Sequence, residues 1–279
     1  MRTRSSILCL TLLCLTSFAA RSGEAQVIVM SYNIRYLNKT DGDDVWPNRS
    51  ADVVKTLGAA DLVGLQEVVD EQLRHVREGR QEFAWFGVGR EDGKKAGEAA
   101  PIGWRKSKFE AIDRGVFWLS ETPEVVGSKG WDAALPRIAT WARLEQKSGG
   151  GELLLINTHF DHRGAEARAE SAKQIQEWIS KNKGDAGVVL TGDFNATLKQ
   201  TPITNLLSGD LLKNARDVSQ SKDPGPNSTW NGFREIVDNR RIDFIFVAGL
   251  KVERFETLNP KTEAGRFASD HLPVVAVVK

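Results

Sequence analysis

Carboxylate, amide and imidazole side chains recur along this chain where apolar segments end. The apolar run at residues 187–192 is broken by Asp193 and Asn195, and Asp270 with His271 precedes a second apolar run far downstream. A strand that ends in such residues presents them at the edge of a sheet, where open α/β sheets bind their ligands. These segments are therefore candidates for chemistry more than for packing.

Six segments share this signature of an apolar run broken by polar residues. Any one of these residues alone is usually a turn former or a cap. Together they supply oxygen ligands for a hard metal ion, two imidazoles, spare carboxylates and neutral amides, which is the inventory of metal-assisted phosphoester hydrolysis. The residues are Asn33, Glu67, His159, Asp193 with Asn195, Asp243, and Asp270 with His271.

Hydrophobic periodicity indicates the elements that would position these residues. Strands are predicted at residues 27–30, 61–65, 83–88, 101–105, 109–119, 138–145, 153–160, 188–193, 242–247 and 273–278, and helices at 48–57, around His75 and at 165–179. Glycines, lysines and acids at residues 89–98 predict a hairpin loop between two of the strands.

This mixture of strands and helices, with polar residues collected at strand ends, favours a four-layer α/β sandwich. In that architecture two central sheets pack together and helices cover their outer faces. Strands that follow one another directly between residues 83 and 119 imply largely antiparallel sheets. The pattern alone leaves a doubly wound sheet as the alternative.

In their order along the chain, the motifs resemble those of the endonuclease/exonuclease/phosphatase superfamily, which includes deoxyribonuclease I. The matching motifs are Ser31-Tyr32-Asn33-Ile34, Leu65-Gln66-Glu67, Asn157-Thr158-His159, Gly192-Asp193-Phe194-Asn195, Arg241-Ile242-Asp243-Phe244-Ile245 and Ser269-Asp270-His271. The resemblance implies the deoxyribonuclease I-like fold and metal-dependent hydrolysis of phosphoester bonds. Residues 101–109 are similar to the nocturnin and deadenylase branch, although Gly103 departs from its pattern.

The resemblance also implies how a metal ion would be held. Glu67 would bind Mg²⁺ or Mn²⁺ through a carboxylate oxygen, which is the ligand type that these ions prefer. Asn33 would contact the metal or the phosphate, and Asp270 would be a further ligand.

The remaining motif residues would handle protons and charge. His271 would act on the attacking water or stabilise the transition state, with Asp243 fixing its tautomer. Asp193 is the alternative base, and the sequence leaves this choice open. His159 and Asn195 would donate hydrogen bonds to phosphoryl oxygens as charge develops.

Three further residues are weaker candidates for substrate contacts. Glu98 lies near the position where deoxyribonuclease I carries a glutamate that orients the histidine equivalent to His159; it could equally be a solvated loop acid. Arg163, favoured over its neighbour His162, would meet a second phosphate, unless it is only surface charge. Trp230 would stack on a base or sugar, or else it covers the core.

The first 25 residues have the pattern of a secretory signal peptide. Arg2 and Arg4 precede an apolar run at residues 7–20 that is short for a membrane span. Both cysteines lie in this segment, so the mature chain would contain no disulfide. We therefore expect an exported, bacterial-type protein, secreted or periplasmic, with one catalytic domain at residues 26–279.

Without the signal segment, the charge balance is 35 basic against 36 acidic residues, so no basic field is available to hold a polyanion. The leading hypothesis is a secreted phosphodiesterase or nuclease that acts on nucleic acid or nucleotides. The alternative is a phosphomonoesterase, or a phosphodiesterase of phospholipids or sugar phosphates. A non-catalytic binding protein is less favoured. We expect a monomer without a protein partner or stable membrane insertion.

Overall fold

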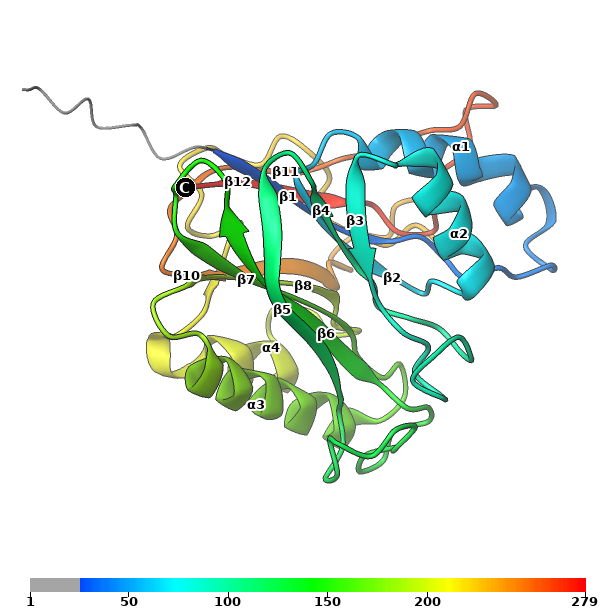
Figure 1. The fold of residues 1–279 in the computed structure, drawn as a ribbon. Coiled ribbons are helices and arrows are strands. Elements are labelled where there is room, and N and C mark those ends of the chain that lie inside the picture. Colours follow the sequence, from blue (N-terminus) through cyan, green and yellow to red (C-terminus); the bar gives the residue numbers. More distant parts are fainter. Residues whose placement is uncertain (1–25) are drawn as a thin grey trace, which may run out of the picture.

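Two six-stranded sheets pack face to face, and helices cover the outer surface of each (Figure 1). The computed structural model describes residues 26–279, so the predicted signal segment lies outside the described residues. The four layers confirm the predicted α/β sandwich and exclude the doubly wound alternative. Within residues 26–279, every helix is too short or too polar to span a bilayer.

The first sheet has the strand order β11-β12-β1-β2-β4-β3. Its strands are β1 (Val27–Asn33), β2 (Leu62–Gln66), β3 (Phe83–Phe86), β4 (Ile102–Arg105), β11 (Val252–Thr257) and β12 (Val274–Val278). Helices α1 (Trp46–Leu57) and α2 (Asp70–Gly79) cover its outer face, and the 3-10 turn η1 (Gly42–Asp44) precedes α1. β1 and β2 are parallel, with Asn33 opposite Gln66.

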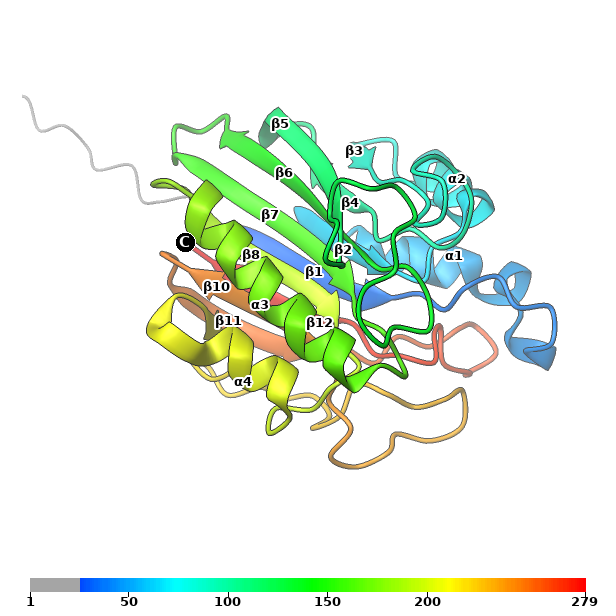
Figure 2. The same cartoon turned by 90° about the horizontal axis from the view of Figure 1, so that it is seen from below.

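The second sheet has the strand order β5-β6-β7-β8-β10-β9. Its strands are β5 (Phe109–Trp118), β6 (Ile138–Gln146), β7 (Glu152–His159), β8 (Gly187–Asp193), β9 (Lys213–Asn214) and β10 (Asp243–Ala248). Helices α3 (Ala165–Asn182) and α4 (Thr201–Leu207), followed by η2 (Ser208–Asp210), lie across its outer face (Figure 2). β7 and β8 are parallel, with His159 opposite Asp193.

Apolar side chains fill the spaces between the layers. Leu62 of the first sheet and Val189 and Ile245 of the second belong to the core between the sheets. Ile175 and Ile179 of α3 pack with the outer face of the second sheet. Burying each such side chain contributes roughly 1.5–3 kcal/mol, so the sandwich holds the strand ends in fixed positions.

Most predicted elements are present, and the sheets are largely antiparallel, with one parallel pair in each. The structure adds β9, β11 and α4 to the predicted elements. β11, with the sequence Val-Glu-Arg-Phe-Glu-Thr, lies at a sheet edge and carries a register shift between Val252 and Arg254. Charged residues on an edge strand weaken the alternating pattern that identifies strands. β9 and α4 are too short to show periodicity.

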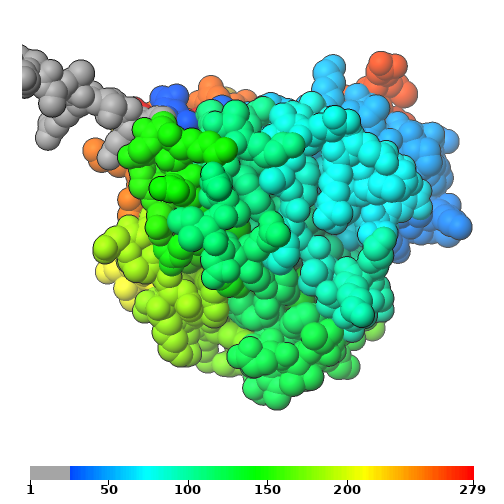
Figure 3. Space-filling model, viewed as in Figure 1, coloured from blue at the N-terminus to red at the C-terminus, as the bar shows by residue number. Residues whose placement is uncertain are grey.

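The loops that follow β3 and β5 extend from one end of the sandwich. They span residues 87–101 and 119–137 and appear in teal and green at the lower edge of the space-filling view (Figure 3). Backbone bonds pair Gly89 and Val68 with Ala99, which confirms the predicted hairpin between β3 and β4.

Candidate active site

The two parallel strand pairs end at the same edge of the sandwich, so polar residues of both sheets meet there. Asn33 ends β1, Glu67 follows β2, and His159 and Asp193 end β7 and β8. The Asn33 amide Nδ2 donates to Glu67 Oε1 and to Asp193 Oδ2, each at 3.0 Å. One amide therefore links a carboxylate of the first sheet to a carboxylate of the second.

Glu67 is fixed at both carboxylate oxygens. Oε1 accepts from Asn33, and Oε2 accepts from the backbone N–H of Tyr36 at 3.1 Å. The backbone of Glu67 has a φ of 61°, in the left-handed region that side chains other than Gly, Asn and Asp seldom occupy. Such a conformation costs about 1–3 kcal/mol and persists only where its surroundings enforce it. The strained backbone and the two hydrogen bonds together hold the Glu67 carboxylate in one position in the cleft.

His271 lies between two buried aspartates. Its Nδ1 is 2.9 Å from Asp243 Oδ2, and its Nε2 is 3.7 Å from Asp193 Oδ2. The raised pKa of His271 places a proton on Nδ1, which donates to Asp243 Oδ2. Asp243 and Asp193 face each other in the register of β10 and β8. The arrangement orients Nε2 toward Asp193 and the cleft.

Burial and mutual charge shift the pKa values of this group. Burial, followed by the charge of Asp243, raises the pKa of Asp193 to about 7, although His271 opposes the shift. Burial alone would lower the pKa of His271, but the charges of Asp243 and Asp193 raise it well above its usual value. Asp193 is thus poised to exchange a proton near neutral pH, which is what a general base requires.

His159 is held by an amide on one side and faces a carboxylate on the other. Asn195 Nδ2 lies 3.1 Å from His159 Nε2 and also donates to the Phe160 carbonyl at 3.0 Å. An amide nitrogen is a donor, so Nε2 accepts and Nδ1 carries the proton. Burial, then the charges of Arg137 and Arg90, lower the pKa of His159. His159 is therefore a neutral imidazole in this arrangement.

Glu98 lies beside His159, in the position that the resemblance implies. Its Oε2 is 3.8 Å from His159 Nδ1, and Arg90 donates to both of its carboxylate oxygens at 2.9 and 3.1 Å. Burial raises the pKa of Glu98, while Arg90 opposes this shift. The side chain is thus paired and mostly buried, unlike a solvated loop acid.

Asp270 lies beside Arg35, with Oδ2 3.8 Å from Nη1. Burial and the nearby charge of Glu67 raise its pKa to about 6, although His271 opposes the shift. Asp270 therefore shares the electrostatic environment of Glu67, where a cation would be favoured.

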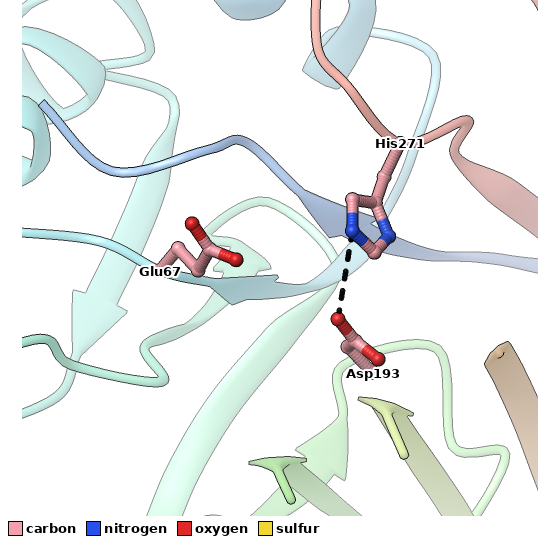
Figure 4. A group of neighbouring side chains, drawn as sticks. All are labelled: Glu67, Asp193 and His271. Atoms are coloured by element: carbon pink, nitrogen blue, oxygen red, sulfur yellow. Dashed lines mark ion pairs between the residues drawn. The ribbon is translucent and has the colours of Figure 1, made fainter. Parts of the chain in front are cut away.

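A metal ion has suitable ligands where Glu67, Asp193 and His271 converge. One ligand atom from each lies within 4.8 Å of the others, and Figure 4 shows the three side chains around a common space. The carboxylate oxygens of this group fit a hard divalent cation such as Mg²⁺ or Mn²⁺, whereas the raised pKa of His271 keeps its ring protonated and unable to act as a ligand. The predicted set was Glu67, Asn33 and Asp270. Asn33 lies against Glu67, whereas Asp270 is outside the converging group.

A cleft of about 390 Å³ opens over this group. Glu67, Glu98, His159, Asp193, Asn195, Asp270 and His271 line it, whereas Asn33 and Asp243 lie behind its wall. Beyond the predicted residues, its walls include Arg35, Tyr36, Leu135, Arg137, His162 and Arg240. Trp230 lines the cleft, with the Arg240 guanidinium 4.0 Å from its ring centre.

In the loop after β7, the prediction that Arg163 contacts the substrate in preference to His162 does not agree with where the two side chains lie. The side chain of Arg163 is exposed and is not among the cleft-lining residues, whereas the less favoured His162 does line the cleft. Asp161, through Oδ1, accepts from the backbone N–H groups of Arg163 and Gly164 and so closes a tight turn. The turn places the His162 side chain at the cleft and leaves that of Arg163 outside it, and the sequence alone does not show this difference.

Sequence reasoning missed the cleft arginines. Arg35 follows Asn33 by two positions, and Arg240 precedes the Arg241-Ile242-Asp243 motif, so proximity to a motif was an available signal. Arg137 immediately precedes β6 but lies far in sequence from the six motifs. Only the fold shows that it reaches the cleft.

Comparison with known proteins assigns the family. Residues 30–271 match the endonuclease/exonuclease/phosphatase family, and the chain belongs to that family. A family member from Bacteroides vulgatus is 38% identical, with a TM-score of 0.87 over 91% of this chain and 99% of that one. A mannosyl-6-phosphatase of Bacteroides thetaiotaomicron is 35% identical, with a TM-score of 0.84 and the same coverage of both chains.

Drosophila melanogaster nocturnin is 25% identical over 182 residues. The match covers 52% of this chain but only 28% of nocturnin. This likeness agrees with the branch that residues 101–109 indicate, although the two Bacteroides proteins are more similar in sequence. The chain is therefore a phosphoester hydrolase of a family that depends on divalent metal ions.

Proposed function

We propose that the protein is a divalent-metal-dependent phosphomonoesterase that releases phosphate from a small phosphorylated compound such as a sugar phosphate. The supporting observation is the compact cleft of about 390 Å³ around Glu67, Asp193 and His271. Its volume is within the range of small-molecule sites. The similar mannosyl-6-phosphatase acts on such a substrate class.

The side chains of the cleft have complementary tasks in this reaction. Asp193 takes a proton from the attacking water, because its carboxylate has a pKa near neutrality and lies beside His271 Nε2. Asp243 holds the His271 ring at Nδ1, so that Nε2 faces Asp193. Asn33 holds the Glu67 and Asp193 carboxylates at their separation.

Neutral donors complete the phosphate site. His159 and Asn195 form a hydrogen-bonded pair in the cleft wall. We assign the Asn195 amide to a phosphoryl oxygen, and His159 donates there only after its ring proton moves from Nδ1 to Nε2, once substrate has displaced the Asn195 contact. Both Asn195 amide hydrogens are used within the protein, so substrate binding must compete with the Asn195–His159 contact. Catalytic hydrogen bonds often tighten only when substrate is bound.

A divalent cation, Mg²⁺ or Mn²⁺, is assigned to Glu67 with Asn33 beside it. Of the converging group, Asp193 and His271 are assigned to proton transfer and not to the metal ion. The donor set offers carboxylate oxygen, which these hard ions prefer. When bound, the cation would supply positive charge to the phosphoryl group. Asp270 lies close enough to influence Glu67 electrostatically and is proposed as a supporting acid.

The leading sequence hypothesis, a nuclease or nucleotide phosphodiesterase, is the second candidate. Trp230 supports it, because an aromatic side chain in the cleft can stack on a base as well as on a sugar ring. The near-neutral charge gives it less support, since nucleic-acid binding usually relies on basic surfaces. Export remains a proposal that rests on Arg2, Arg4 and the apolar run after them.

The test is phosphate release from mannose 6-phosphate and phenyl phosphate, run beside cleavage of plasmid DNA and single-stranded RNA. Each assay is run with Mg²⁺, Mn²⁺ or EDTA, and His271→Ala controls for contaminating enzymes. We expect metal-dependent release from the monoesters that disappears in His271→Ala. Cleavage of nucleic acid without monoester hydrolysis would establish the nuclease candidate instead.

A further inference from the structure

His162 stands on the cleft wall outside the converging catalytic group. It follows β7 by three residues, and its side chain is 44% exposed, so a ligand can reach it. It lines the same cleft as Asp193 and His271 but is not among the three ligand atoms that converge. His162 has no assigned role in the hydrolysis itself.

Arg137 fixes the tautomer of His162. The Arg137 Nη2 lies 3.1 Å from His162 Nδ1. A guanidinium has only donors, so Nδ1 must accept, and the remaining ring proton belongs to Nε2. Burial and the charge of Arg137 lower the pKa of His162, in agreement with a neutral ring. His162 is thus an uncharged donor, and its contact with Arg137 determines that Nε2 is the nitrogen that donates.

Asp161 in turn fixes Arg137. Arg137 is 4% exposed, and its Nε lies 3.3 Å from Asp161 Oδ2. Asp161 is itself anchored by the backbone N–H groups of Leu135, Arg163 and Gly164. Within the described residues Arg137 Nη1 has no partner, so Nε and Nη2 are the atoms that hold the guanidinium in place. The ion pair of Asp161 and Arg137 positions one imidazole at the cleft.

We propose that His162 binds the leaving group of the substrate by donating from Nε2 to a hydroxyl oxygen, and that Arg137 positions it. This inference rests on the proposed function and names its substrate class, a phosphomonoester of a polyhydroxylated alcohol. A neutral donor suits an uncharged oxygen, whereas a phosphate oxygen is better matched by the cation and the catalytic donors. A site built to hydrogen-bond a hydroxyl also discriminates against substrates that lack one.

The experiment compares two probes that differ in the leaving group. Mannose 6-phosphate carries several hydroxyls, and phenyl phosphate carries none. In His162→Phe we expect KM for mannose 6-phosphate to rise about tenfold, the effect of losing one hydrogen bond, while kcat changes little. KM and kcat for phenyl phosphate should stay within about twofold, and His162→Asn should restore part of the lost affinity.

Two further variants separate positioning from general damage. Arg137→Met should raise the same KM, and adding His162→Phe to it should have little further effect, because the two residues act through one contact. His75→Phe, which removes a histidine outside the cleft, should leave both substrates unaffected. Thermal unfolding first establishes that each variant is folded at the assay temperature.

Two results would overturn the inference in different ways. If His162→Phe changes both probes equally, or neither, His162 does not recognise the leaving group, and the proposed phosphomonoesterase stands. If the wild-type protein hydrolyses neither probe with Mg²⁺ or Mn²⁺, the proposed function and this inference fail together.

Discussion

The two sheets contribute different chemistry to the same cleft. On the side of the first sheet, hydrogen bonds fix both carboxylate oxygens of Glu67. On the side of the second sheet, the buried Asp193 and Asp243 face an imidazole, and the pKa of Asp193 is raised to about 7. A carboxylate that is fixed at both oxygens suits a cation, whereas a carboxylate with a raised pKa suits proton transfer.

This difference suggests a division of labour between holding a metal ion and moving protons. Two residues connect the halves. Asn33 donates to carboxylates on both sides, and His271, which precedes β12 of the first sheet, contacts Asp243 of the second. Variants on each side of the cleft should therefore fail in different ways.

The largest effect is expected for Asp193→Asn. The amide keeps the shape of the side chain but cannot accept the proton of the attacking water. We expect kcat for mannose 6-phosphate to fall by about 10³-fold, within the range for loss of a general base. Steady-state kinetics at saturating Mg²⁺ measure the loss, and circular dichroism checks the fold. Undiminished turnover would remove Asp193 from the proton chemistry.

A smaller loss is expected for Asp243→Asn, which leaves His271 in place but replaces the carboxylate at Nδ1 with an uncharged amide that can donate as well as accept. Because Asp243 also raises the pKa of His271, that pKa should fall in the variant. We expect kcat to drop by about 10²-fold, because the His271 ring loses the carboxylate that orients it and stabilises its charge. Nuclear magnetic resonance titration of the His271 ring checks the pKa directly. A ring that titrates as in the wild type would contradict the assigned contact.

The smallest effect on chemistry is expected for Asp161→Asn, which lies behind the cleft wall. Burial alone would raise the pKa of Asp161, but the N–H groups of Gly164 and Arg163 and the charge of Arg137 lower it below the usual 3.8. Because the folded-state pKa is lowered, the ionised carboxylate stabilises the fold above pH 3.8, and this stabilisation is lost as the pH falls below it.

Asp161→Asn should therefore lower the free energy of unfolding by about 2 kcal/mol at pH 7, the range for a hydrogen bond to a charged group. The difference from the wild type should shrink as the pH falls below 3.8. Urea denaturation at pH 7 and pH 3 measures both values. An equal difference at the two pH values would show that the ionised carboxylate is not the stabilising group.

The sandwich and the polar residues at its strand ends could be predicted from the sequence, because these residues immediately follow long apolar runs. Asn33, Glu67, His159 and Asp193 are fixed in space once two parallel strand pairs end at one edge. Periodicity and polar residues at strand ends carry this information, and both are local properties of the sequence.

The cleft walls were less predictable for a physical reason. Arg137 reaches the cleft through a buried ion pair with Asp161, a contact across 24 residues of sequence. His162 and Arg163 are adjacent, yet a tight turn at Asp161 places only the former in the cleft. Side-chain directions in such turns depend on hydrogen bonds that no periodic pattern records.

The measurement that tests the division of labour most directly is calorimetric titration of Mg²⁺ and Mn²⁺ into the wild-type protein, Glu67→Gln and Asp193→Asn. If Glu67 holds the cation and Asp193 serves the proton chemistry, Glu67→Gln should weaken metal binding by at least about tenfold, as loss of a ligand should. Asp193→Asn should bind nearly as tightly as the wild type while remaining inactive. Equal loss of affinity in both variants would show that Asp193 is a metal ligand and would contradict the assignment of separate roles to the two sheets.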